Sequence, residues 1–262
     1  MAITSKFICA VVLVLAFGAA PALAQDMLDQ VDLTLPQFTE AEYSRADIEA
    51  LIAAKDPLDF SGKHLNGMDL SGLNLAGAVF RAAGLNKTIL RGANLKGAIF
   101  DQAWMLRADL TDADITGGNL FGTQLRWAIL RGANLQGARI TADLGSAQME
   151  GAKLAGANLG ADMTNQSMGL MRAVMNSAKL DGADFSKADL SRVNLQFASL
   201  KGANLTGANL MGADMSGAKL EGADVTGANF KGTDMTSAEL KGLLNADKSN
   251  IEQAKNLDRA FR

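Results

Sequence analysis

The most constraining feature of this chain is a five-residue period that runs through most of its length. From Leu65 to Ile140 an apolar residue recurs at every fifth position. The register then slips by one to Leu144, and the apolar series continues to Leu159. We expect the series to resume at Leu170 and to run on to Leu240. Alanine usually stands two residues before the apolar residue, asparagine or aspartate just before it, and glycine two residues after it.

A five-residue period excludes both simple secondary structures. On an α-helix five residues advance by about 500°, so successive leucines would form no stripe. On a straight strand an odd period would turn every second leucine outward. The pattern fits a short extended piece followed by a turn, in which the alanine and the apolar residue both point inward. Glycine then accepts the corner conformation, and a chain that turns the same way every five residues winds into a solenoid.

The tandem motif Ala-(Asp/Asn)-Leu-x-Gly resembles the pentapeptide-repeat family, and segment 202–210 shows it almost undisturbed. The resemblance covers residues 58–245 and implies an all-β solenoid, a right-handed quadrilateral β-helix with four pentapeptides per coil. Residues 58–245 then correspond to about nine coils stacked at ~4.8 Å. Inward Leu, Phe, Met and Ala columns would fill the interior, which agrees with an aromatic content of only 5%.

Residues 1–24 are typical of a cleavable signal peptide. Lys6 precedes an uncharged apolar run from Phe7 to Ala20, and residues 21–24 supply a small-residue cleavage site ending at Ala24. A membrane anchor is the weaker alternative, since the run is shorter than the roughly 20 residues that span a bilayer. We therefore expect a periplasmic or otherwise exported protein with no stable membrane span. Cys9, the only cysteine, would leave with the signal.

Two terminal segments outside the repeat are expected to cap the solenoid. Residues 25–57 are acidic, and Thr39 with Glu42 fits a capping box for a helix ending near Lys55. Residues 246–262 contain a second capping box, Ser249 to Glu252, and helical spacing predicts a capping helix over 250–261. Leu257 and Phe261 on this C-terminal helix are candidate contacts for a homodimer.

Catalytic, cofactor and metal sites are not predicted. His64 is the only histidine and lies at an outward position, which is typical of a solvated side chain. The sequence gives no indication of a pocket near the acidic residues Asp109, Asp112 and Asp114, and we expect them to lie on a solvated face. A methionine cluster could hold Cu(I) in an exported protein, but its members point in different directions and do not converge. These methionines are Met163, Met168, Met171 and Met175.

The two register slips, at 140–144 and 159–170, each predict a bulge or a distorted corner. One interpretation is tolerated drift of the repeat. The other is that residues 160–169 form a deviant loop that contacts a partner.

The best candidate for a partner-binding site is an aromatic patch with arginines, because such residues are enriched in interface hot spots. The two tryptophans of the chain stand near apolar centres 20 residues apart, so with four repeats per coil they share one side of the solenoid. The alternative is that they pack on each other or on the acidic N-terminal segment, since residues 60–140 carry nine basic and five acidic residues. The predicted patch comprises Trp104, Leu106, Arg107, Phe121, Arg126 and Trp127.

These observations favour a non-enzymatic, exported protein that binds or spaces protein partners as a rigid rod. The near balance of 25 basic against 28 acidic residues argues against nucleic-acid binding. The resemblance also implies an alternative, because some members of the family protect DNA gyrase by imitating duplex DNA. The predicted export and the net basic first half of the repeat oppose this alternative.

Overall fold

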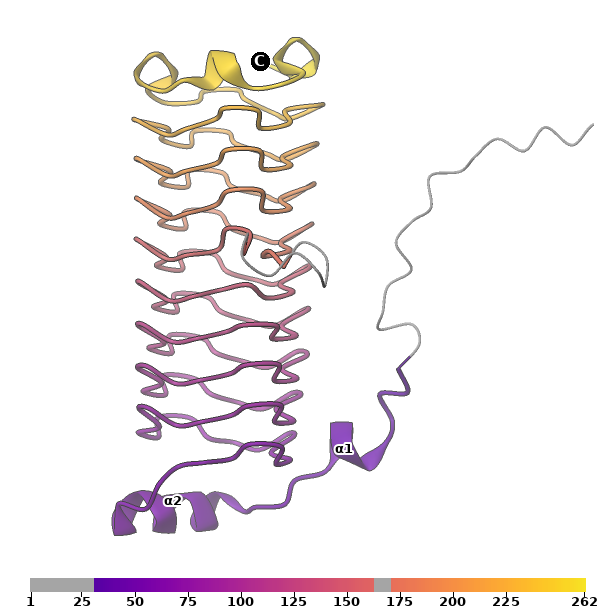
Figure 1. The fold of residues 1–262 in the computed structure, drawn as a ribbon, viewed down its shortest axis with the longest axis vertical. Coiled ribbons are helices and arrows are strands. Elements are labelled where there is room, and N and C mark those ends of the chain that lie inside the picture. The colour runs from indigo at the N-terminus through magenta and orange to yellow at the C-terminus, as the bar shows by residue number, and fades with distance from the viewer. Residues whose placement is uncertain (1–30, 163–170) are drawn as a thin grey trace, which may run out of the picture. The chain divides into compact units, whose positions relative to one another are not determined.

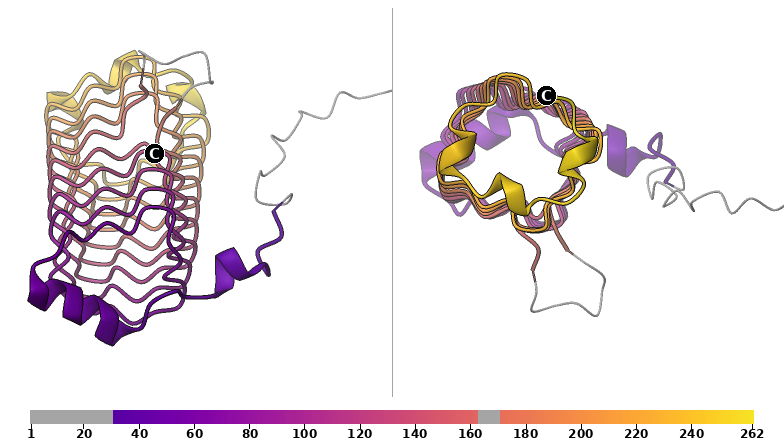
Figure 2. Two further views of the ribbon diagram at one scale, coloured as in Figure 1. Left: turned by 60° about the horizontal axis from the view of Figure 1, so that its bottom comes forward. Right: turned by 90° about the horizontal axis from the view of Figure 1, so that it is seen from above.

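The computed structural model describes residues 31–162 and 171–262, and one compact unit spans Thr34–Arg262. Within this unit the chain winds upward in stacked coils (Figure 1). Seen end on, the coils superimpose into one closed outline (Figure 2). The coils are joined by isolated parallel bridges, such as Asn74 to Asn94 and Asn94 to Asp114, mostly 20 residues apart. Four five-residue units therefore complete one coil, as the resemblance to the pentapeptide-repeat family implies.

Backbone hydrogen bonds between coils hold this arrangement. The N–H of each inward apolar residue donates to a carbonyl of the next coil, as from Leu90 to Asp109 at 2.6 Å. The inward apolar residues and the alanines two positions before them are almost completely buried. Phenylalanine rings stack along one side of the interior, with centroids 5.3 Å apart from Phe60 to Phe80 and 5.0 Å from Phe80 to Phe100.

One side of the solenoid, which we call face B, includes the tryptophan Trp104. Its residues stand just before the inward apolar residues of successive coils and bridge one another in order. They are His64, Gly84, Trp104, Gln124, Asp143, Val174, Asn194, Asp214 and Asp234.

Both register slips interrupt this regular step. Gln124 bridges Asp143, so one residue is missing from that coil. Asp143 bridges Val174, which lies eleven residues beyond a regular coil. The N–H of Ala173 donates to Leu159 O, so Met175 is the inward residue that follows Leu159 in the ladder. Leu170, at which the predicted series resumes, lies outside the described residues.

The N-terminal cap is a helix that begins five residues later than expected. Helix α1 spans Pro36–Thr39 and helix α2 spans Arg45–Ala54. The capping box is formed by Ser44 and Asp47, not by Thr39 and Glu42. Glu42 instead accepts hydrogen bonds from the first coil, and this contact prevents it from capping a helix.

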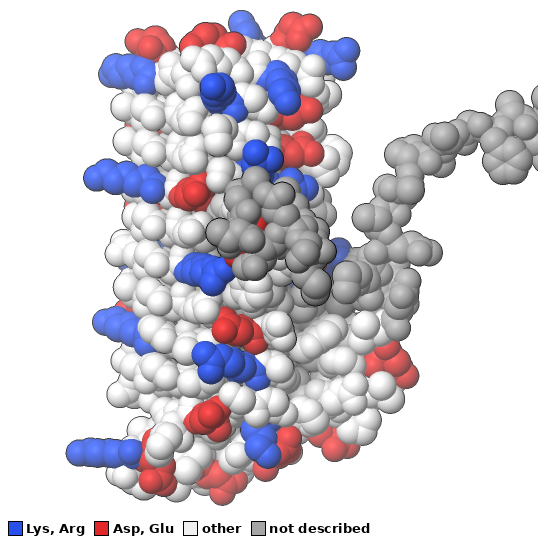
Figure 3. Space-filling view, viewed as in Figure 1, with Lys and Arg blue, Asp and Glu red and all other residues white. Residues whose placement is uncertain are grey.

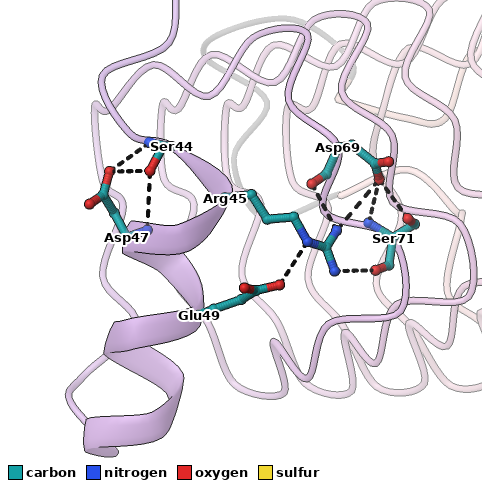
Figure 4. Close-up of polar contacts among 6 residues, drawn as sticks. All are labelled: Ser44, Arg45, Asp47, Glu49, Asp69 and Ser71. Atoms are coloured by element: carbon teal, nitrogen blue, oxygen red, sulfur yellow. Dashed lines mark hydrogen bonds and ion pairs between the residues drawn. The ribbon is translucent and has the colours of Figure 1, made fainter.

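Helix α2 is fastened to the first coil by polar contacts on one side and apolar contacts on the other. Arg45 pairs with Glu49 and donates to the carbonyls of Asp69 and Ser71 (Figure 4). Ile48 is fully buried against the coil, and the Tyr43 ring meets the Phe60 ring edge-on at 5.7 Å. The helix therefore covers apolar residues that the first coil would otherwise expose.

The C-terminal segment is not the α-helix that its spacing predicts. It forms three short 3-10 turns, η3 (Ala246–Lys248), η4 (Ile251–Gln253) and η5 (Leu257–Arg259). Between these turns the chain pairs with the coil below, since Leu240 N donates to Phe261 O and Lys255 N donates to Thr233 O. The backbone groups of the preceding coil need partners, and a helix would leave them unpaired. In the described part of the chain, no helix has the length and apolar character to cross a membrane.

Replacing the buried Ala133 by leucine should destabilise the solenoid. The alanine side chain is fully buried within the coil, so the added atoms force neighbouring side chains apart. We expect the free energy of unfolding in urea to fall by about 1–3 kcal/mol. Gln136→Leu, at an exposed position of the same coil, serves as control and should change it by less than about 0.5 kcal/mol.

Stability should also fall in acid, because several aspartates cap their own corners. Hydrogen bonds from Ser61 and Ser71 hold the pKa of Asp59 and Asp69 below its ordinary value of 3.8. A pKa lowered by folding stabilises the protein above that ordinary value, and this stabilisation is lost as the pH falls through the folded pKa. Urea unfolding from pH 6 to pH 2 should show this loss.

Asparagine replacements test whether these aspartates cause the loss of stability at low pH. Asn204 already accepts a corner hydrogen bond from Thr206 N at 3.0 Å, so an amide can cap this corner. The double variant Asp59→Asn/Asp69→Asn should keep the fold and show a shallower decline below pH 4. An unchanged decline of stability below pH 4 would show that these carboxylates do not cause the decline.

Candidate partner-binding corner

The corner that follows face B carries the exposed tryptophan, and we call it the Trp127 corner. Each of its residues donates its backbone N–H to the next coil, as from Trp127 to Gly145 O and from Phe197 to Ser216 O. The corner is therefore one hydrogen-bonded column with one residue per coil. Its members are Gly67, Lys87, Arg107, Trp127, Ser146, Ser177, Phe197, Gly217 and Ser237.

This corner differs from the others in its backbone chemistry. All of its residues have a positive φ, near +58° at Lys87 and Arg107 and +59° at Trp127, yet only Gly67 and Gly217 are glycines. A side chain in this left-handed conformation costs about 1 kcal/mol relative to glycine. The next corner along the coil, five residues further on, carries glycine at every member except Asp112: Gly72, Gly92, Gly132, Gly151, Gly182, Gly202, Gly222 and Gly242. The chain therefore retains side chains at the Trp127 corner against a conformational cost.

Trp127 lies at the centre of a cluster of cations on this corner. Its side chain is 38% exposed. The Cζ atom of Arg126 lies 5.0 Å from the ring centroid, and that of Arg107, from the preceding coil, lies 5.6 Å away. These distances are in the range of cation–π interactions, which hold the ring in place while part of it faces solvent.

Phe197 is a second aromatic residue on the same corner, and the sequence analysis missed it. Its side chain is 67% exposed, the most exposed of the large apolar residues in the described chain. The ring lies along the corner over Gly217, where an added Cβ would be 2.5 Å from Cδ1 of Phe197. A tabulation of corner residues at four-repeat intervals would have found it, because Phe197 replaces the expected glycine.

Trp104 is covered by the N-terminal segment, which is the alternative that the charge distribution favoured. Its ring lies 4.9 Å from the Phe38 ring of α1, at an interplanar angle of 60°. Asn66 Nδ2 donates to Gln37 O at 3.0 Å and Glu40 O at 2.8 Å, so asparagines of the first coils bind the segment's backbone. Leu106 is only 5% exposed, so this member of the predicted patch is not available to a partner.

Charge also contributes to the docking of this segment. Glu42 accepts hydrogen bonds from Lys63 Nζ at 3.0 Å and from the backbone N–H of His64 at 3.1 Å. The hydrogen bond from Lys63 is the main cause that lowers the pKa of Glu42. His64 lies 3.6 Å from the same carboxylate, and it is half-buried beside Glu42 rather than free in solvent.

Phe121 belongs to a different corner. It precedes face B within its coil, and Arg139 Cζ lies 4.8 Å above its ring. The structure therefore divides the predicted patch into three parts. Trp104 and Leu106 lie under or beside the N-terminal segment, Arg107, Arg126 and Trp127 form the exposed corner, and Phe121 pairs with Arg139.

Two pockets among the described residues lie away from the Trp127 corner and from Trp104. A largely apolar pocket of about 490 Å³ opens at the C-terminal end, lined by Leu240, Leu243, Ile251 and Leu257 among others. A polar pocket of about 340 Å³ lies beside Arg139 and Asp162, which form an ion pair at 3.2 Å. Residues 31–162 and 171–262 contain no group of three His, Cys, Asp or Glu side chains that could hold a metal ion. Of the methionine cluster, Met163 and Met168 lie outside the described residues.

The geometry defines the class of fold, which is a four-sided parallel β-helix built from five-residue units. The family model for pentapeptide repeats matches residues 59–97, 88–123, 108–141, 170–207, 188–227 and 208–242. The chain belongs to the pentapeptide-repeat family, whose members are right-handed quadrilateral β-helices. No curated protein sequence matches this chain.

Three solved structures are similar to this chain to different extents. HetL, a pentapeptide repeat protein involved in heterocyst differentiation regulation from the cyanobacterium Nostoc sp. strain PCC 7120, is 30% identical, and the match covers 84% of this chain and 97% of HetL (TM-score 0.37). A trypsin-treated variant of QnrB1, a plasmid-mediated fluoroquinolone resistance protein, is 17% identical over 77% of this chain and 91% of its own, with a TM-score of 0.53. A pentapeptide repeat protein from the Arabidopsis thaliana thylakoid lumen is 32% identical over 47% of this chain and 65% of its own (TM-score 0.16).

Gly84 permits the N-terminal segment to dock, and its replacement should release the segment. A Cβ at Gly84 would lie 2.9 Å from Gln37 O, whereas the same position in the next coils holds Trp104 and Gln124. Gly84→Val should increase cleavage by glutamyl endopeptidase after Glu40 and Glu42 at least fivefold. Gln124→Val, on the same face but beyond the segment, should leave the cleavage rate unchanged; equal rates in the wild type and Gly84→Val would contradict the docking.

Proposed function

We propose that this protein is a non-enzymatic scaffold that binds a protein partner through the Trp127 corner. The observation that carries the proposal is that seven of the nine left-handed positions of this corner retain a side chain, whereas the other corners carry mostly glycine. An exposed aromatic ring held by arginines is the composition typical of an interface hot spot. Of the six residues predicted for the site, Trp127, Arg107 and Arg126 therefore keep the binding role in this proposal.

The proposal places the protein in the periplasm or another exported compartment. It is supported by residues 1–24, whose basic start, apolar run and small-residue site are typical of a signal peptide. A solenoid of about nine coils would present the corner there without any disulfide, since parallel backbone bonds and buried apolar columns stabilise it. A homodimer through the C-terminal end, with Leu257 and Phe261 as contacts, stays a prediction; Phe261 is exposed and Leu257 lines the apolar pocket.

The DNA-mimicking alternative requires rows of carboxylates along the solenoid. Acidic and basic side chains are interspersed on the face that Figure 3 shows. Many outward aspartates cap corners of their own coil, as Asp214 accepts from Ser216 N at 3.1 Å and Asp224 from Thr226 N at 2.9 Å. We therefore expect a gyrase supercoiling assay to be unaffected by this protein.

In-cell crosslinking tests the proposed binding role. The yield of a partner that crosslinks to the wild type should fall at least tenfold in Trp127→Ala. The matched control is Met211→Ala, because Met211 is 40% exposed on another corner and Trp127 is 38% exposed. Retention of every crosslinked partner by folded Trp127→Ala would overturn the proposal.

A further inference from the structure

Side chains along the Trp127 corner follow a symmetric order of size. Two aromatic residues, Trp127 and Phe197, enclose two serines, Ser146 and Ser177, one residue per coil. With coils about 4.8 Å apart, the aromatic residues lie about 14 Å from one another along the corner. The serines leave a low stretch between two projecting rings, and Ser177 and Phe197 are exposed.

This order is self-complementary under a two-fold rotation. A two-fold axis that passes between the coils of Ser146 and Ser177 places Trp127 of one copy level with Phe197 of the other. The small serines then face one another at the centre, where the two backbones approach most closely. Such an isologous contact is the commonest way in which soluble chains pair.

Charges along the same side agree with this rotation. The coils before Trp127 present Arg107 and Lys87, both exposed. The coils after Phe197 carry Asp214 and Asp234 on face B. The two-fold axis brings the coil of Arg107 level with the coil of Asp214, and the coil of Lys87 level with that of Asp234. A parallel arrangement would instead place Arg107 against Arg107 and Trp127 against Trp127.

We propose that the partner bound at the Trp127 corner is a second copy of this chain, packed side by side and antiparallel. The inference rests on the proposed binding role of this corner and names its occupant. The N-terminal segment covers Asn66, which binds its backbone, but leaves Lys87 and Arg107 exposed to the second copy. A contact along one edge of each solenoid is small, so we expect a dissociation constant of about 1–100 µM.

Sedimentation equilibrium at 1 µM to 1 mM tests the dimer with protein purified from cells that express the full sequence. Trp127→Ala and Phe197→Ala should each raise the dissociation constant at least tenfold. Met211→Ala, which removes an equally exposed apolar side chain from another corner, should leave it within twofold. A monomer throughout this range, or an equal effect of all three variants, would overturn the dimer.

Cysteine crosslinking tests the antiparallel register. In a Cys9→Ala background, Ser146→Cys and Ser177→Cys are made as separate single variants. A mixture of the two should form disulfide-linked dimers at least fivefold more than either variant alone, because the axis places Ser146 level with Ser177 of the other copy. Equal crosslinking by each variant alone would indicate a parallel pair, and no crosslinking would indicate that another surface pairs; either result overturns the proposal.

The two proposals fail separately. A monomeric wild type whose other cellular partner is lost in Trp127→Ala overturns the antiparallel dimer and supports the binding role of the corner. Folded Trp127→Ala and Phe197→Ala that pair as strongly as the wild type and keep every crosslinked partner overturn both.

Discussion

The whole structure depends on one hydrogen bond repeated between coils, from the N–H of an inward apolar residue to a carbonyl of the coil that follows. This bond forms only if the chain returns to the same side after four turns, and each turn needs a residue with positive φ. The turns place the apolar residues inside, where the alanines keep the sides close and the stacked rings of Phe60, Phe80 and Phe100 fill the wider space. The residues that can vary for function are therefore those at the outward position of each side and those at the corners.

Periodicity allowed the solenoid to be predicted, because the pattern that encodes it is local and repeated many times. The conformations of the two terminal segments were harder to predict, because each depends on contacts with one particular coil. Glu42 binds Lys63 and His64 instead of capping a helix, so Ser44 supplies the cap. The C-terminal residues have helical spacing, yet unpaired groups of the preceding coil draw them into 3-10 turns. At both ends, contacts with the adjacent coil, whose backbone groups need hydrogen-bond partners, override the local helix propensity.

The candidate site was predicted in part for a similar reason. Composition and the 20-residue spacing pointed to Trp127 with its arginines, and the opposite charges of the acidic segment and the first coils pointed to the cover over Trp104. Leu106 is covered because it adjoins a buried row of asparagines, in which Asn86 Oδ1 accepts a hydrogen bond from Leu106 N at 2.9 Å. Phe197 could not be predicted from its local motif, because only the alignment of corner residues from successive coils distinguishes it.

The second register slip bears on how such a chain can change in length. Between Asp143 and Val174 the chain holds eleven residues more than a regular coil, yet Ser146 and Ser177 remain neighbours in one column. The ladder is interrupted after Leu159 and resumes at Ala173, whose N–H donates to Leu159 O. Gain or loss of a single five-residue unit between Trp127 and Phe197 would instead rotate every later residue by a quarter of a coil, and the two rings would face different directions. In the lineage of this protein, length can therefore vary there only by whole coils or by loops that leave the ladder.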